Sequence, residues 1–323
     1  DAQGLYKWLS KDIHKRLRFN ERYYLHPTDQ SFTEMGRSGQ GRCEDITNMI
    51  TFAARSLALA TAADYTPYWA HRDNNHAWNV LLDRNGVGFD KAQSHAAKVY
   101  RKTFAIQRQS LPFRLSEGRE PPNRFMASTT AVDVTDQYME TSVVEVALDE
   151  KKTAGEKHAY LCVFNGGAWK AIAWTEIRKD GTARFQRMGR GILYLPCVHD
   201  GEKLVAVSHP VLLGNAGQVT SLPGKDDTRS VIAVAVSPKK VSPDTFEETP
   251  VNYLKAGATY VLKRWDTTTG DWTDVREHEA GEKAPRFEDL PVDGLYWFVL
   301  KDGKPRRLER PWTIRPDGFQ RFW

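Results

Sequence analysis

The sequence predicts an α+β protein in which N-terminal helices, packed on a small antiparallel sheet, precede two β-sandwich domains. Three observations support this prediction. Apolar residues recur at helical spacing up to about residue 60, short β-rich runs separated by turns fill the later part of the chain, and one β pattern occurs twice. The length, 323 residues, suits two or three domains.

Two helices are expected near the N-terminus. The stretch "LYKWLSKDIHKRL" carries apolar residues at helical spacing, namely Leu5, Trp8, Leu9 and Ile13. The stretch "CEDITNMITFAARSL" carries a second apolar stripe that begins at Cys43, and Glu44 and Asp45 favour the positive end of that helix.

A strand pair and a linker should follow these helices. "HAWNVLLDRNGVGFD" contains two strand-like runs around Asn85-Gly86, which is a strong hairpin signal. The passage rich in Pro, Arg and Glu at 111–125 is expected to be a linker. The first domain is therefore predicted to cover residues 1–110.

The remaining chain is expected to form two related sandwiches. The stretches "ARFQRMGRGILYLPCVHDGEK" and "PRFEDLPVDGLYWFVLKDGKP" share R-F, L-Y and D-G pairs at equal spacing, so that Tyr194 corresponds to Tyr296. A turn-flanked tryptophan, Trp169 or Trp272, precedes each copy. The predicted domains are 126–222 and 223–323, with aromatic side chains mainly in their cores.

Composition excludes several classes of function. The net charge is only +5, without a dense stripe of Lys and Arg, so no nucleic-acid partner is expected. The three cysteines have neither zinc-site spacing nor the number for a disulfide framework, and no metal is predicted. No apolar run approaches the roughly 18–20 residues of a membrane span.

The stretch "GQGRCEDITNMI" poses the functional question. Cys43 follows a glycine-rich turn and begins a helix, where the helix dipole and unpaired N–H groups would stabilise a thiolate. A free cysteine is also often a small buried residue without chemistry. On position alone, the inert interpretation is favoured.

His76 changes that balance. It opens a predicted strand in "NNHAWNVLL", and a Cys at a helix start with a His on a neighbouring strand is how a cysteine acyl-transfer site is built. The imidazole would accept the proton of the thiol. The two residues together therefore indicate a nucleophile and its base.

With these motifs the chain resembles the transglutaminase-like superfamily, over roughly residues 5–105. The resemblance rests on "GRCEDITNMITFAARSL" and "PYWAHRDNNHAWNVLLD", while "AKVYRKTF" and "ERPWTIRPDGFQRFW" are similar to multidomain members from Bacteroidetes. It implies a papain/transglutaminase-like core, with Cys43 as nucleophile and His76 as general base and acid. It also implies a periplasmic, cell-surface or secreted location.

The residue that orients His76 has two candidates. In the family an acidic residue follows on the next strand, and Asp90 is the nearest carboxylate. A two-residue turn at Asn85-Gly86 would place Asp90 on the opposite face of the sheet and Gln93 diagonally beside His76. Gln93 is slightly favoured, although a bulge in the hairpin would restore Asp90.

Three further residues are candidates for the substrate groove. Gln40, three residues before Cys43, could donate to an oxyanion, or could be an ordinary loop residue. Tyr68 and Trp69 lie on the segment that leads to the His76 strand. They could wall the groove or pack under it.

The predicted function is that of a cysteine hydrolase or acyltransferase acting on peptide or glycopeptide amide bonds, without a cofactor. Its partners would be peptide, protein or glycopeptide substrates, with glycan contacts on the sandwiches as a further expectation. The alternative is a catalytically impaired surface protein that binds peptides or glycans on the same fold.

Overall fold

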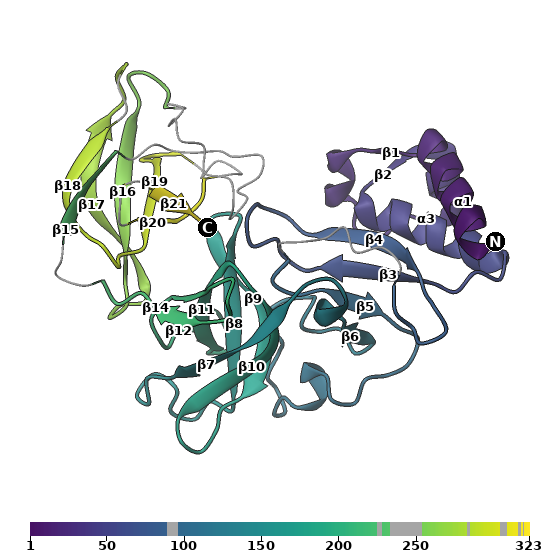
Figure 1. The fold of residues 1–323 in the computed structure, drawn as a ribbon, viewed down its shortest axis with the longest axis horizontal. Coiled ribbons are helices and arrows are strands. Elements are labelled where there is room, and N and C mark those ends of the chain that lie inside the picture. The colour runs from purple at the N-terminus through teal and green to yellow at the C-terminus, as the bar shows by residue number, and fades with distance from the viewer. Residues whose placement is uncertain are drawn as a thin grey trace.

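The structure is a computed structural model. It describes residues 1–88, 96–224, 228–232, 254–282, 285–303, 309–315, 318 and 320–323. The protein is mixed α and β, with three α-helices in an N-terminal module and antiparallel sheets in two later modules (Figure 1). This confirms the prediction of an α+β protein with β-sandwich-like domains.

The N-terminal module packs its helices on one face of a small sheet. Leu81 of the sheet joins the apolar core formed by the helices, and the Tyr6 hydroxyl donates to the Asn79 carbonyl at 3.1 Å. Its elements are α1 (Ala2–Arg16), β1 (Arg18–Phe19), η1 (Glu21–Leu25), α2 (Phe32–Ser38), β2 (Gln40–Gly41), α3 (Cys43–Ser56), β3 (Thr61–Thr66), β4 (His76–Leu81), β5 (Tyr100–Lys102), η2 (Leu111–Phe113), β6 (Ala131–Asp133) and η3 (Thr135–Gln137).

Both predicted helices are present, and the second begins at Cys43 as expected. In α1 the Asp1 carboxylate caps the first turn by accepting from the Gly4 amide at 2.6 Å. Ile13 is buried, as the apolar stripe predicts, but Trp8 is 62% exposed. The buried stripe of this helix, Leu9 and Ile13, is therefore narrower than its apolar pattern.

The sheet has the order β4-β3-β5-β6. Strand β6 comes from beyond the predicted linker, so the first module extends past residue 110. The turn after β4 has three residues rather than the two predicted, because the Asp83 amide donates to the Val87 carbonyl and Leu82 bridges Gly88. Gly86 at φ 74° supplies the left-handed conformation that this turn requires.

A buried ion pair lies within this sheet. Asp64 on β3 is fully buried and accepts two hydrogen bonds of 2.8 Å from the Arg101 guanidinium on β5. The Tyr138 hydroxyl donates to the same carboxylate at 2.6 Å, and Trp78 Nε1 donates to that hydroxyl at 3.0 Å. The network thus reaches β4, two residues from His76.

The first sandwich packs a two-stranded sheet on a larger one. Val144 of β7 and Phe185 of β10 share one core with Leu161, Ile172 and Tyr194 of the larger sheet. The larger sheet has the order β14-β13-β11-β8-β9, with β12 beside β11. The strands are β7 (Thr141–Ala147), β8 (His158–Asn165), β9 (Ala168–Glu176), β10 (Thr182–Gly189), β11 (Ile192–His199), β12 (Leu204–Ala206), β13 (Val211–Leu213) and β14 (Val219–Ser221).

The second β module repeats this arrangement. Its large sheet has the order β17-β16-β19-β20-β21, and β15 pairs with β18 as β7 pairs with β10. The paired tyrosines take equivalent roles, since the Tyr194 hydroxyl donates to the Gly189 carbonyl and the Tyr296 hydroxyl to the Pro291 carbonyl, both at 2.8 Å. The strands are β15 (Thr228–Ile232), β16 (Thr259–Asp266), β17 (Asp271–Glu279), β18 (Arg286–Pro291), β19 (Tyr296–Leu300), β20 (Trp312–Ile314) and β21 (Gln320–Phe322).

Aromatic side chains join the two β modules. Phe164 of the first packs edge-on against Trp272 and Trp297 of the second, with ring centroids 6.0 and 5.0 Å apart. The turn between β16 and β17 also rests on the first sandwich. Lys152 donates to the carbonyl oxygens of Thr267 and Thr268, at 3.2 and 3.0 Å.

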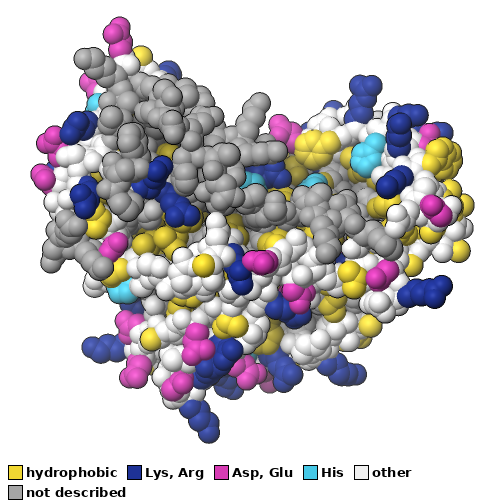
Figure 2. Space-filling view, in the orientation of Figure 1, with side chains coloured by type: hydrophobic (Ala, Val, Ile, Leu, Met, Phe, Trp, Pro, Cys, Tyr) yellow, Lys and Arg dark blue, Asp and Glu magenta, His cyan; other side chains and the backbone are white. Residues whose placement is uncertain are grey.

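The surface carries charges of both signs. On the face shown in Figure 2, the Lys and Arg side chains of the described residues are interspersed with Asp and Glu. Among the described helices, none has the length and apolar character needed to cross a membrane.

Candidate active site

The turn before Cys43 directs the start of α3. Gly39 ends α2 in the left-handed conformation at φ 61°. A Cβ on Gly41 would lie 2.8 Å from the Asp45 side chain, so only glycine fits there. Asp45 is fully buried and accepts from the Arg42 amide at 2.9 Å, which caps the helix. Cys43 is thereby fixed as the first residue of α3.

The Cys43 thiol is buried beside a carboxylate. Its sulfur is the donor in a 3.0 Å hydrogen bond to Glu44 Oε2, and the Tyr24 hydroxyl lies 3.6 Å from it. Burial, reinforced by the charge and hydrogen bond of Glu44, raises the pKa of Cys43 to about 11. The thiol is therefore protonated at neutral pH.

His76 begins β4 and lies among aromatic rings. It stacks on Trp69, with ring centroids 6.0 Å apart and planes at 25°, and its ring is 5.6 Å from that of Trp78. Burial and the positive charge of Arg72 lower the pKa of His76, while the charge of Glu44 opposes them. The imidazole is neutral at pH 7 and can accept a proton.

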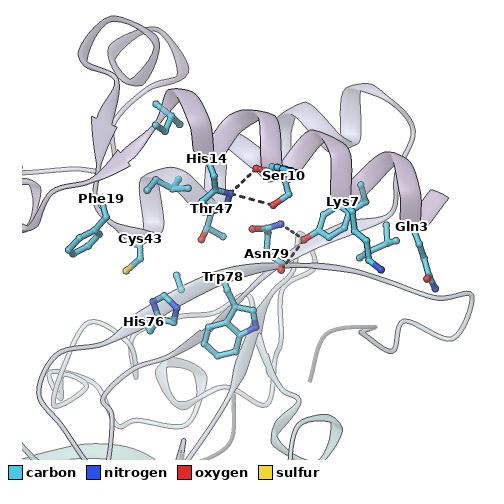
Figure 3. Close-up of a pocket in the computed structure, with 16 residues that line it drawn as sticks. Gln3, Lys7, Ser10, His14, Phe19, Cys43, Thr47, His76, Trp78 and Asn79 are labelled. Carbon is cyan, nitrogen blue, oxygen red and sulfur yellow. Dashed lines mark hydrogen bonds between the residues drawn. The ribbon is translucent and has the colours of Figure 1, made fainter. Parts of the chain in front are cut away.

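Cys43 and His76 line the same pocket. The pocket has a volume of about 950 Å³ and lies between α1, α3 and β4. Figure 3 shows the thiol pointing from α3 toward the start of β4, where the His76 ring lies. Within the described part of the chain, no hydrogen bond joins the sulfur to the His76 ring. A proton transfer between them thus requires the thiol to turn away from Glu44.

Glu44 belongs to the site although its position in the sequence predicted no such role. It was interpreted only as a charge at the positive end of the helix, but it is 8% exposed and turned toward the thiol. The Asn75 side-chain amide donates to its Oε1, and Arg42 Nε lies 3.7 Å from its Oε2. Its place directly after Cys43 in the sequence was the signal that could have indicated a contact with the thiol.

The three residues predicted to line the substrate groove differ in how close they lie to the site. Gln40 is half-buried and accepts from the Asn20 amide at 2.6 Å, outside the residues that line the pocket. Tyr68 packs edge-on against Phe125, with ring centroids 5.3 Å apart. Trp69 is 3% exposed and serves as the surface on which His76 stacks.

The two candidates for orienting His76, Asp90 and Gln93, lie outside the described residues. The geometric argument between them assumed a two-residue turn, which the turn at Asp83–Val87 does not have. The identity of the orienting residue therefore stays a prediction.

In their described parts the sandwiches have no aromatic side chain among the large exposed apolar residues. The large exposed apolar side chains there are Val219 and Val275, and none is aromatic. Their tryptophans pack against one another, as Trp265 does with Trp169 and Trp272 at centroid distances of 5.6 and 5.3 Å. This matches the expectation that aromatic residues of the repeat form cores, and it gives the glycan-binding expectation no support.

A scan against protein-family models finds no match, and a search of the curated proteins finds no similar protein.

Proposed function

We propose that this protein is a transglutaminase-like cysteine hydrolase or acyltransferase that acts on peptide or glycopeptide amide bonds. The observation that supports this most directly is that Cys43, the first residue of α3, and His76, the first residue of β4, line one pocket of about 950 Å³. A helix start and a strand start that converge on one pocket are the arrangement that thiol-based acyl transfer needs.

The reaction would begin with rotation of the Cys43 thiol from Glu44 to His76. His76 takes the thiol proton as the sulfur attacks the amide carbonyl carbon and forms the carbon–sulfur bond. N–H groups in the first turn of α3, which have no carbonyl partner within the helix, stabilise the resulting oxyanion. His76 then protonates the leaving amine, the carbon–nitrogen bond breaks, and a thioester remains.

The second half of the reaction releases the acyl group. Water or an amine gives a proton to His76 and attacks the thioester carbonyl, and Cys43 leaves as the thiol after the proton returns to it. The product is an acid with water or a new amide with an amine. An extracytoplasmic location, as implied by the resemblance, would suit extracellular peptide or glycopeptide substrates.

A matched pair of histidine variants tests the proposal. We expect His76→Ala to slow alkylation of Cys43 by iodoacetamide severalfold at pH 8, because the thiol loses the base that accepts its proton. His14→Ala is the control, since His14 lines the same pocket from α1 but is hydrogen-bonded to the Ser10 carbonyl at 2.8 Å. Peptide mass spectrometry would measure the rates.

The alkylation rate of Cys43 is compared between variants and not with the rates of Cys162 and Cys197. They are at most 1% exposed, so Cys43 would react faster for reasons of access alone. Equal alkylation of Cys43 in the wild type and in His76→Ala would contradict the proposal.

One observation favours the alternative of a binding protein on the same fold. The thiol is bonded to Glu44, and a pKa of about 11 leaves little thiolate at neutral pH. In that case the pocket would bind a peptide without cleaving it. Cys43 would then be alkylated equally fast in the wild type and in His76→Ala, and the wild type and Cys43→Ala would bind the peptide equally well.

A further inference from the structure

The loop between β3 and β4, residues 67–75, leads directly into His76. Within the loop the Trp69 amide donates to the Asn74 carbonyl at 3.0 Å, and Trp69 also forms an isolated β-bridge with Ala96. Asn74 adopts a positive φ of 69°, which is uncommon outside glycine. A loop with this conformation needs partners outside itself to keep one arrangement.

Those partners come from the first sandwich. Asn165, the last residue of β8, is 4% exposed, and its side-chain amide lies 3.0 Å from three carbonyl oxygens, those of Trp69, Arg72 and Asn74. Its Oδ1 accepts from the Asn74 amide at 3.2 Å. The neighbouring Gly166 amide donates to Asp73 Oδ1 at 2.7 Å. One hairpin turn thus holds the loop along most of its length.

The second β module adds one side chain, which contacts the same loop at two residues. Arg310 is 2% exposed, donates from Nη2 to the Ala70 carbonyl and places Nη1 3.6 Å from Asp73 Oδ1. Its Nε donates to the Trp323 carbonyl at 2.7 Å, which ties the guanidinium to its own module.

The loop in turn fixes both sides of the candidate site. The Asn75 side chain donates to Glu44, and Glu44 accepts from the Cys43 thiol. At the other side, Trp69 forms the stacking surface of His76. A continuous series of contacts therefore runs from Asn165 through the loop to the thiol and to the imidazole.

We propose that Asn165 is a positioning residue for the Cys43–His76 site and acts through the β3–β4 loop. This rests on the proposed function only in treating Cys43 and His76 as reactive groups. The first sandwich then helps to form the site, because it holds the loop that contacts Glu44 and His76. Its β8–β9 turn determines the positions of the Glu44 and Trp69 side chains.

A matched control distinguishes positioning from general stabilisation. Asn123 has a comparable hydrogen-bonding pattern, donating to the Ala171 carbonyl at 3.0 Å and accepting from the amides of Phe125 and Met126 at 3.0 and 3.1 Å. It also ties a segment to the first sandwich. That segment meets the β3–β4 loop through the packing of Phe125 on Tyr68, outside residues 69–75, whose exchange is measured.

The experiment compares Asn165→Ala with Asn123→Ala in the full chain. We expect hydrogen exchange of the 69–75 amides to increase at least about tenfold in Asn165→Ala only. We also expect the pH profile of Cys43 alkylation to shift to lower pH in that variant, because Glu44 is no longer held against the thiol. Wild-type exchange of these amides in Asn165→Ala, or an equal shift in Asn123→Ala, would overturn the proposal.

A measurement on the wild type covers the case in which Asn165→Ala does not fold. The Asn74 amide should exchange with the same denaturant dependence as the amides of β8, since its acceptor belongs to that strand. If the Asn74 amide instead exchanged with the denaturant dependence of the α3 amides, the positioning role would be refuted. Neither exchange measurement depends on catalysis, so an inactive protein would count against the proposed function and not against this inference.

Discussion

Replacing Glu44 by Gln should make Cys43 react about tenfold faster with iodoacetamide at pH 8. The substitution keeps the size of the side chain but removes the charge that, after burial, contributes most to raising the pKa of the thiol. One unit of pKa corresponds to a tenfold change in the thiolate fraction at a fixed pH below the pKa. Since the thiolate is the reactive form, the rate follows that fraction.

The pH dependence gives the sign of the effect. In the wild type the alkylation rate should keep rising with pH toward about 11. In Glu44→Gln the rise should level off at lower pH, because less alkali is needed to ionise a thiol without a neighbouring negative charge. Stopped-flow or timed alkylation between pH 7 and 11 would show both profiles.

Glu117→Gln is the control for this experiment, since Glu117 is an exposed carboxylate far along the chain from the site. Identical pH profiles in Glu44→Gln and wild type would show that Glu44 does not restrain the thiol. An increase in alkylation accompanied by slower amide hydrolysis would instead assign Glu44 a role in orienting Cys43 during the reaction.

The second large effect should come from Arg101→Met, with a loss of about 3–5 kcal/mol in the free energy of unfolding of the N-terminal module. Asp64 is fully buried, and its two hydrogen bonds to the guanidinium would be lost. The Tyr138 hydroxyl would remain as a donor, but it does not neutralise the charge. Denaturant unfolding monitored by tryptophan fluorescence would measure the change.

Arg16→Met provides the comparison for Arg101→Met. The Arg16–Asp12 pair has a similar N–O distance of 3.1 Å, but the Arg16 side chain is 76% exposed. We expect this variant to cost less than about 1 kcal/mol, as exposed ion pairs usually do. If the two variants proved equally stable, the buried pair would not be what holds β3 to β5.

The sequence predicted those features that depend on local pattern. Cys43 begins α3 because a glycine turn precedes an apolar helical stripe, and His76 begins β4 because a strand pattern starts there. The duplicated β module was visible in the matched tyrosines, Tyr194 and Tyr296, whose hydroxyls make equivalent hydrogen bonds. Each of these signals is a local pattern, and in the repeat the same local pattern occurs at two places in the chain.

Features that depend on distant contacts were not predictable in this way. Glu44 turns toward the thiol because Asn75, 31 residues away, donates to it. Asn165 meets the β3–β4 loop from 91 residues beyond Asn74. In sequence, an Asn followed by two glycines indicates only a turn. Helical spacing does not tell how wide the covering surface is, so it did not show that Trp8 lies outside the core.

The β8–β9 turn and the β16–β17 turn occupy the same place in the two β modules, and each contacts the module that precedes it in the chain. The β8–β9 turn contacts the N-terminal module through Asn165, and the β16–β17 turn contacts the first sandwich through the carbonyl oxygens that Lys152 reaches. Each repeat thus docks on the module that precedes it. The docking contact therefore lies within the duplicated unit itself, at the same turn in both copies.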